Sequence, residues 1–201
     1  MKIKAIIFDI DGVLADSREA VVHNTKTLLQ EFGFIVNAEE VERMSRAHSA
    51  DTVLLSLAPT LSHDGELLKK MLRRLSELTV ENLGMVAPLP LCGKIPGLSE
   101  KYRLGAATNR KGSAVLVLEK LGVRRYFGAV VTSSDAPPKP DPKMIEIALG
   151  KLRVKPGEAV FVGDNIEDKQ AGEAAGARAI IVNGADSASV EVFLREFLPE
   201  S

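Results

Sequence analysis

The sequence contains very little cysteine and few aromatic residues. Of its 201 residues only Cys92 is a cysteine, none is tryptophan, and aromatic residues make up 4%. A lone cysteine excludes a disulfide framework within the chain and a cysteine-based metal cluster, and it is compatible with a reducing compartment. Scarce aromatic side chains argue against a surface on which nucleic-acid bases stack.

The sequence also lacks a charge imbalance and a long apolar run. Its formal net charge is −1, so no basic surface for nucleic acid is indicated. No segment approaches the roughly 18 apolar residues of a membrane-spanning helix, and the apolar stretch before Asp9 is too short for a signal peptide. We therefore expect a cytoplasmic protein, a monomer or homodimer, with no nucleic-acid or membrane partner.

Short apolar runs alternate with helical patterns along most of the chain. Continuous apolar runs of this length are typical of strands buried on both faces of a parallel sheet. Helical patterns follow three of the runs, over 112–121, from Pro142 with Asp141 as its cap, and over 166–175. The alternation predicts an α/β protein with a doubly wound, Rossmann-like parallel sheet. The expected strands are 3–8, 104–108, 129–132, 159–162 and 179–182.

Residues 16–84 interrupt this alternation. They contain no convincing strand, and their apolar spacing predicts a small all-helical insertion. The proline-rich stretch 88–97 is expected to be the linker back to the sheet. The sequence thus predicts a core of 1–15 with 85–201 and a helical domain of 16–84. The first helix is expected to be capped at Asp16 and to run to about Phe32, and Asn37 with Glu40 can open the second. Two more helices are expected over 49–57 and 63–82.

Two acids stand at the end of the first expected strand. In open α/β sheets ligands bind beyond the carboxyl ends of the strands, which is where Asp9 and Asp11 lie. Carboxylates this close repel each other, so the pair needs a metal or works as an acid and base couple. Gly12 lets the backbone turn sharply away from them. For this segment in isolation, a turn with a helix-capping acid is the simpler interpretation.

Polar residues also follow the next two strands. Thr108 and Asn109 offer a hydroxyl and an amide that can bind phosphate oxygens. Lys139 stands in Pro-Pro-Lys-Pro-Asp-Pro, where the neighbouring prolines restrict the backbone and can hold its ammonium group against a phosphate. A structural role remains open for each of them: Thr108 and Asn109 could simply end a strand, and Lys139 could be an exposed lysine in a rigid loop.

The fourth expected strand ends in Gly-Asp-Asn-Ile-Glu-Asp. Asp164 and Asp168 are four residues apart and can share one face of the helix that begins there. Carboxylate oxygens suit Mg²⁺, although helix-capping acids are also common at such positions. What makes a functional site the better interpretation is the combination, because acids, a hydroxyl and a lysine follow successive strands of one sheet.

These segments resemble the motifs of the haloacid dehalogenase superfamily of phosphohydrolases. Phe8-Asp9-Ile10-Asp11-Gly12-Val13 is similar to the first motif and Ala-Thr108-Asn-Arg to the second. Lys139-Pro-Asp-Pro is similar to the third and Gly163-Asp164-Asn165-x-x-Asp168 to the fourth. The resemblance covers residues 6–177. The helical insertion resembles the cap of phosphoglycolate phosphatases and β-phosphoglucomutases.

The resemblance implies a magnesium-dependent phosphatase. Asp9 would attack phosphorus and form an aspartyl-phosphate, and Asp11 would act first as the acid and then as the base. Mg²⁺ would be held by Asp9, Asp164 and the backbone carbonyl of Asp11. Asp168 would bind the metal through water or orient Lys139.

The same resemblance implies how the substrate is held. Thr108, the amide of Asn109 and Lys139 would bind the oxygens of the transferring phosphoryl group, and the cap would close over a small phosphorylated metabolite and select it. Phosphoglycolate and sugar phosphates are both compatible. Arg46, in Met-Ser-Arg of the cap, resembles an arginine that contacts the second phosphate in the mutases, although for this residue alone a solvated charge at a helix end is the favoured interpretation.

The sequence leaves two other functions open. One is a β-phosphoglucomutase-like mutase, against which stands Val21 at the position of that family's hinge histidine. The other is a phosphate-binding regulatory module without turnover, against which stands the complete set of acids. Phosphatase activity is the prediction favoured by the residues together.

Overall fold

The structure, a computed structural model, describes residues 2–47 and 50–198. In this part of the chain five parallel strands form one sheet in the order β5-β4-β1-β6-β7. The predicted doubly wound parallel sheet is therefore confirmed. The strands are β1 (Ala5–Phe8), β4 (Arg103–Thr108), β5 (Phe127–Thr132), β6 (Ala159–Gly163) and β7 (Arg178–Ile181).

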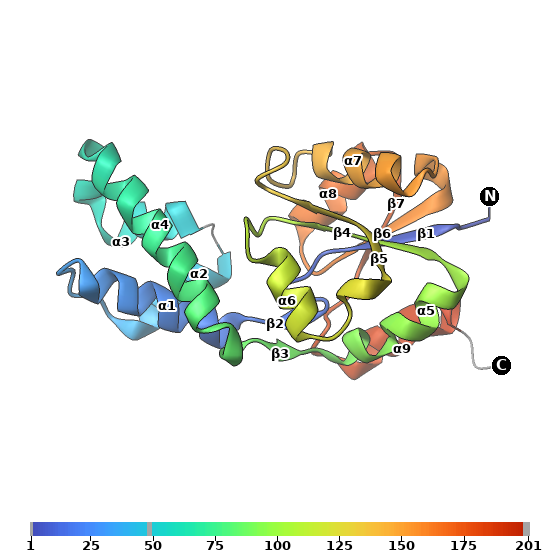
Figure 1. Cartoon of the computed structure of the whole chain (residues 1–201), viewed down its shortest axis with the longest axis horizontal. Helices are drawn as coiled ribbons and strands as arrows, with labels where there is room; N and C mark the ends of the chain where they lie inside the picture. The colour runs from blue at the N-terminus through green and yellow to red at the C-terminus, as the bar shows by residue number, and fades with distance from the viewer. Residues whose placement is uncertain (1, 48–49, 199–201) are drawn as a thin grey trace. The chain divides into compact units, whose positions relative to one another are not determined.

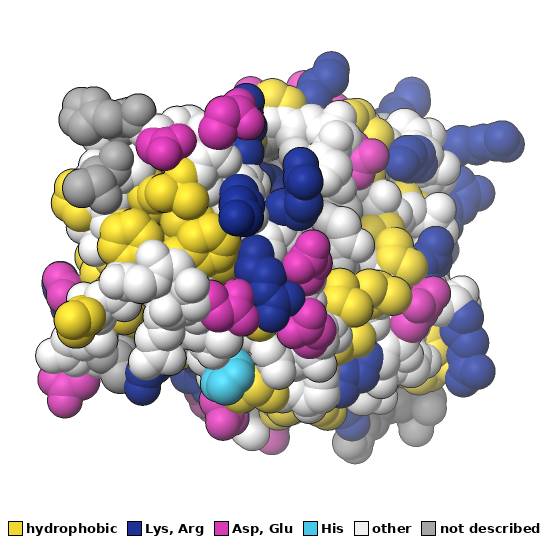
Figure 2. Space-filling view, turned by 60° about the vertical axis from the view of Figure 1, so that its left-hand side comes forward, with side chains coloured by type: hydrophobic (Ala, Val, Ile, Leu, Met, Phe, Trp, Pro, Cys, Tyr) yellow, Lys and Arg dark blue, Asp and Glu magenta, His cyan; other side chains and the backbone are white. Residues whose placement is uncertain are grey.

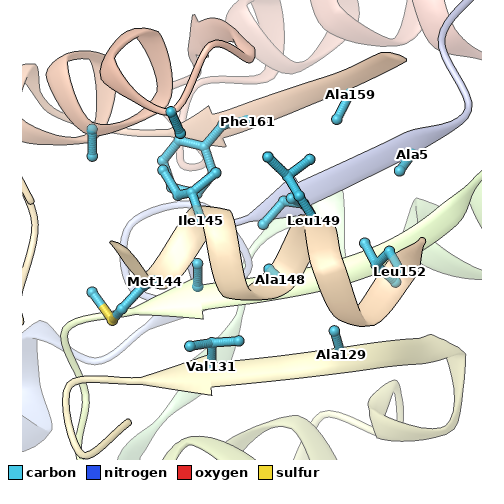
Figure 3. Packing of buried hydrophobic residues seen from close by; sticks show 14 residues of the cluster. Ala5, Ala129, Val131, Met144, Ile145, Ala148, Leu149, Leu152, Ala159 and Phe161 are labelled. Atoms are coloured by element: carbon cyan, nitrogen blue, oxygen red, sulfur yellow. The ribbon is translucent and has the colours of Figure 1, made fainter. Parts of the chain in front are cut away.

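Side chains of β1 point alternately to the two faces of the sheet and pack into the core on both. Ile7 joins the buried cluster on the side of α7 (Lys143–Leu152), where Ile145 and Phe161 lie close together (Figure 3). Phe8 points to the other face and makes an edge-to-face contact with Phe193. Successive residues of a strand face opposite sides, so an apolar run buries both faces of the central strand.

Helices cover both faces of the sheet (Figure 1). On one side lie α7 and α8 (Ile166–Ala174); on the other lie α5 (Ile95–Lys101), α6 (Ala114–Lys120) and α9 (Ser187–Phe197). The expected cap of α7 differs in detail, because Pro142 is the N-cap residue and Asp141 instead accepts a hydrogen bond from the amide of Lys143. The 3₁₀ helices are Pro59–His63, Leu83–Met85, Pro90–Lys94, Arg124–Tyr126 and Pro156–Glu158.

The chain divides into two compact units. Unit 1 comprises Met1–Asp16 and Ala87–Ser201, and unit 2 comprises Ser17–Val86. The chain leaves unit 1 after β2 (Ala15–Asp16) and returns at β3 (Ala87–Pro88), and these two strands pair in antiparallel fashion. A two-residue strand is too short to show a period of two, which is why the sequence indicated a plain linker here.

Unit 2 is helical. Its helices are α1 (Arg18–Glu31), α2 (Ala38–Ala47), α3 (Ala50–Leu57) and α4 (Gly65–Glu81). Arg74 on α4 binds Glu31 on α1, and it also binds Glu81, which lies on the same face of α4 about two turns further along. The ion pair with Glu31 joins the two helices by charge as well as by packing. The core consists of apolar side chains from all four helices and the turn between α3 and α4: Leu28, Leu29, Val41, Leu54, Ala58, Leu61, Met71 and Leu78.

Basic and acidic side chains are interspersed on the face of the molecule that Figure 2 shows, in keeping with the net charge of −1. Within 2–47 and 50–198, no helix is both long and apolar enough to cross a membrane.

Candidate active site

Three acids converge at the carboxyl edge of the sheet. Asp9 follows β1, Asp164 follows the adjacent strand β6, and Asp168 lies in the first turn of α8. Each offers one carboxylate oxygen, and these three atoms lie within 4.8 Å of one another. They meet because Phe8 and Val162 are paired in register, so that the two strands end at the same level.

The acids of the fourth motif have separate tasks. Asn165, not Asp164, caps α8 by accepting a hydrogen bond from the amide of Asp168 at 3.0 Å. Asp164 is therefore not required as the helix cap, the simpler alternative that the sequence left open. Asp168 is 1% exposed, and its Oδ2 accepts a hydrogen bond from the amide of Asp164 at 3.0 Å.

A buried lysine joins these acids. Nζ of Lys139 lies 2.5 Å from Oδ1 of Asp168 and 3.1 Å from Oδ2 of Asp9. Its ammonium group also lies 5.3 Å from the centre of the Phe161 ring. Since Oδ1 of Asp168 contacts Lys139 and Oδ2 contacts the backbone, Asp168 is placed to orient the lysine.

The backbone around Lys139 is held by Asn109. Oδ1 of Asn109 accepts from the amide of Lys139 at 2.8 Å, and Nδ2 donates to the carbonyl of Lys139 at 3.4 Å. The side chain of Asn109 therefore fixes the lysine loop, which leaves only its backbone amide as the candidate phosphate donor. Thr108, at the tip of β4, is 1% exposed, and its Oγ1 accepts from the amide of Arg110 at 3.2 Å.

Burial shapes the ionisation of this group. It raises the pKa of Asp9 to about 7, against the opposing effect of Lys139. Burial, together with the neighbouring charge of Asp168, raises the pKa of Asp164 to about 6. For Lys139 burial opposes the charged form, but the carboxylates of Asp9 and Asp168 outweigh it and raise its pKa above the usual value. The negative charge of the three carboxylates thus exceeds the positive charge of the one ammonium group among them.

Asp11 lies beside a cation, Arg110, for which the sequence by itself indicated no role. Nε of Arg110 donates to Oδ2 of Asp11 and Nη2 donates to Oδ1, both at 2.7 Å. Nη1 of Arg110 donates to Oγ of Ser113 at 3.1 Å. The two paired residues are 99 positions apart, so no local pattern could have signalled the contact. Arg110 does stand directly after Thr108 and Asn109, the only hint in the sequence.

The structure thus brings together Asp9, Asp164, Asp168 and Lys139, with Asp11 bound to Arg110 in the same unit. Arg46 belongs to α2, and its side chain lies outside the part of the chain that the structure describes.

The acids fit a divalent cation. Three carboxylate oxygens within 4.8 Å, two of them on groups with a raised pKa, form a set of hard donors whose repulsion a cation would relieve. A buried carboxylate that faces a buried ammonium group at the end of a strand is an arrangement that suits transfer of a phosphoryl group.

Comparison with known proteins agrees with this geometry. The model of the family described as haloacid dehalogenase-like hydrolase matches residues 6–182. The chain is 28% identical to pyrophosphatase PpaX of Bacillus velezensis, over 88% of this chain and 82% of that protein. It is 29% identical to phosphoglycolate phosphatase of Nitrosospira multiformis, over 90% and 84%.

A solved structure shares the fold. It comes from Lactobacillus plantarum and is described as a provisionally assigned phosphoglycolate phosphatase. Its sequence is 23% identical to this one, and the two structures superimpose with a TM-score of 0.75 over 95% of this chain and 92% of that one. The match to the family model extends from β1 through the last strand and includes each of the four acids, Thr108 and Lys139. The chain therefore belongs to the haloacid dehalogenase-like hydrolases, and it is a phosphatase.

Proposed function

We propose that this phosphatase hydrolyses a small phosphorylated metabolite, with Mg²⁺, through an aspartyl-phosphate on Asp9. The observation that carries the proposal is the position of Asp9. It directly follows the central strand β1, and its carboxylate lies 3.1 Å from the Lys139 ammonium and within 4.8 Å of carboxylate oxygens of two further acids. A nucleophilic carboxylate is useful where a cation faces it, because the cation offsets the charge of the incoming phosphate.

In the first step an oxygen of Asp9 attacks phosphorus, a phosphorus–oxygen bond forms, and the bond to the leaving oxygen breaks. Asp11 gives that oxygen its proton. In the second step water attacks the phosphorus, Asp11 takes a proton from the water, and Asp9 is released together with inorganic phosphate. Two easier displacements thus replace one difficult displacement.

Other residues hold the reacting groups. Lys139, oriented by Asp168, and Thr108 bind the oxygens of the phosphoryl group, with the backbone amide of Asn109. Asp9, Asp164 and the carbonyl of Asp11 would hold Mg²⁺, which neutralises charge on the phosphate as a Lewis acid. Asp168 serves mainly the lysine, because both of its oxygens already have partners in the chain.

The substrate is proposed to be small. One relative is named a pyrophosphatase and another a phosphoglycolate phosphatase, and both names concern compact phosphate compounds. Unit 2 is proposed to act as a cap that selects the substrate, with Arg46 as one candidate contact. The position of unit 2 supports this role, because it is a helical segment inserted into the chain between β2 and β3.

The test is phosphate release from a panel of pyrophosphate, 2-phosphoglycolate, sugar phosphates and nucleoside monophosphates, with Mg²⁺ and with chelator. We expect release that requires Mg²⁺ and disappears in Asp9→Asn. Glu119→Gln, an equally small change of an exposed acid on α6, serves as the matched control and should keep full activity. Release that survives in Asp9→Asn would contradict the role of Asp9.

The covalent intermediate has its own test. Wild-type protein mixed with substrate and quenched in acid should carry one added phosphoryl group on the peptide that contains Asp9, as detected by mass spectrometry. Turnover without such a peptide would point to direct attack by water. Transfer of the phosphoryl group to a second hydroxyl of a sugar phosphate, instead of to water, would indicate the mutase.

A further inference from the structure

Arg110 is a buried cation that the proposed mechanism does not use. Its side chain is 10% exposed, although an arginine is rarely buried without a strong reason. Burial opposes its charge, yet the carboxylate of Asp11 outweighs burial and raises the pKa of Arg110. The guanidinium group is therefore a permanent positive charge inside the site.

The contacts of Arg110 leave part of its hydrogen-bonding capacity available. A guanidinium group has five N–H donors. Within residues 2–47 and 50–198, Nε and Nη2 bind Asp11 and Nη1 binds Ser113, each through one bond. Each Nη nitrogen keeps a second proton without a partner in that part of the chain. Both protons belong to one planar guanidinium group, whose N–H donors suit the oxygens of a carboxylate or phosphate.

The position of Arg110 indicates which part of a substrate could reach these remaining donors. Lys139 binds Asp9 and Asp168, on the side where the phosphoryl group is transferred. Arg110 instead binds Asp11, the residue proposed to protonate the leaving oxygen. The two buried cations therefore serve different ends of the substrate: Lys139 the transferring phosphoryl group, and Arg110 the group that leaves.

We propose that Arg110 selects substrates whose leaving group carries its own negative charge, a carboxylate or a second phosphate close to the broken bond. This inference rests on the proposed function, because it uses the role of Asp11. An uncharged leaving group, such as a polyol, gains little from a desolvated guanidinium group, whereas an anion gains charge-assisted hydrogen bonds. Arg110 is in this view a specificity residue for the phosphatase reaction.

The test compares two substrates that differ only at this point. 2-Phosphoglycolate has a carboxylate where 2-hydroxyethyl phosphate has a neutral hydroxymethyl group. We expect Arg110→Met to lower kcat/KM for 2-phosphoglycolate by roughly 10- to 100-fold, the effect of losing a hydrogen bond to a charged group. For 2-hydroxyethyl phosphate the change should stay within a few fold. For 2-phosphoglycolate, kcat/KM of Arg110→Lys should lie between the values of the wild type and of Arg110→Met, because an ammonium group keeps the charge and loses the planar set of donors.

Lys111→Met is the matched control, since Lys111 is the next cation along the chain and is exposed. It should leave the ratio of the two kcat/KM values unchanged. An equal loss on both substrates in Arg110→Met would show that Arg110 only positions Asp11 and would overturn the inference. A shift of the ratio by Lys111→Met and not by Arg110→Met would overturn it as well.

A binding measurement separates this inference from the proposed function. In the Asp9→Asn background, calorimetry should show that adding Arg110→Met weakens binding of 2-phosphoglycolate by roughly tenfold or more and scarcely affects 2-hydroxyethyl phosphate. The same weakening for both compounds would overturn the inference. Absence of phosphate release from every compound in the panel would instead count against the proposed function, whatever the binding shows.

Discussion

Gly12 lies directly against the carboxylate of Asp164. A Cβ built on Gly12 would fall 1.8 Å from Oδ2 of Asp164, far closer than two such atoms can approach. Gly12 also has a φ of +76°, in the region that glycine adopts with little strain. The turn after Asp9 and Asp11 thus makes room for an acid from a different strand.

From this contact we predict that Gly12→Ala displaces Asp164 and weakens Mg²⁺ binding by about 10- to 100-fold, as loss of support for a ligand commonly does. Gly122→Ala is the control, because Gly122 has a similar φ of +72° and nothing within 4 Å of its position for Cβ. Both variants should lose roughly 1–2 kcal/mol of stability from backbone strain. Titration with Mg²⁺ that finds equal affinity in the two variants would contradict the prediction.

The ion pair of Lys139 and Asp168 predicts a strong coupling in stability. Lys139→Met leaves Asp168, which is 1% exposed, charged without its cation. Breaking a buried pair in this way costs about 3–5 kcal/mol. The double variant Lys139→Met with Asp168→Asn removes both charges, and we expect denaturant unfolding to find it more stable than Lys139→Met alone. Additive losses would mean that the two side chains do not interact energetically.

The raised pKa of Asp9, about 7, and of Asp164, about 6, predict a pH dependence. In the folded protein without metal these groups hold protons that the unfolded chain releases near pH 4. Their contribution to stability is therefore fully present below about pH 4 and is lost as the pH rises through 6 and 7. Between pH 5 and 8 the melting temperature without metal should fall.

Mg²⁺ should act in the opposite direction over the same range. Binding requires both acids in the ionised form and displaces their protons, so the affinity for Mg²⁺ rises with pH. We expect the increase in melting temperature caused by Mg²⁺ to be larger at pH 8 than at pH 5. A shift that is independent of pH would show that Asp9 and Asp164 do not change protonation when the metal binds.

The packing beneath α7 predicts where stability resides in unit 1. Ile145 is fully buried between α7 and the sheet, as Figure 3 shows, whereas Ile166 at the start of α8 is 63% exposed. Ile145→Ala should cost about 2–5 kcal/mol because it leaves a cavity. Ile166→Ala should change the free energy of unfolding by about 0.5 kcal/mol or less. Similar losses in urea unfolding would contradict this assignment of the core.

Much of the fold follows from local pattern. An apolar run predicts each strand of the sheet, and the observed ends differ from the predicted ones by one or two residues. For example, β5 begins at Phe127 instead of Ala129. A strand buried on both faces leaves a continuous signal, and glycine marks the ends of neighbouring helices. By contrast no helix is predicted over α9, although Val190, Phe193 and Phe197 recur there at helical spacing and are buried.

The sequence by itself determined which chemical groups stand at the strand ends, since those groups follow directly from residue type and from the position of each apolar run. Only the tertiary structure decided how they are paired. The side chain of Asn109 holds the backbone of Lys139, Asp168 holds its ammonium group, and Arg110 holds Asp11. Such contacts join residues far apart in sequence, and they depend on strand register and loop direction, which local periodicity does not encode.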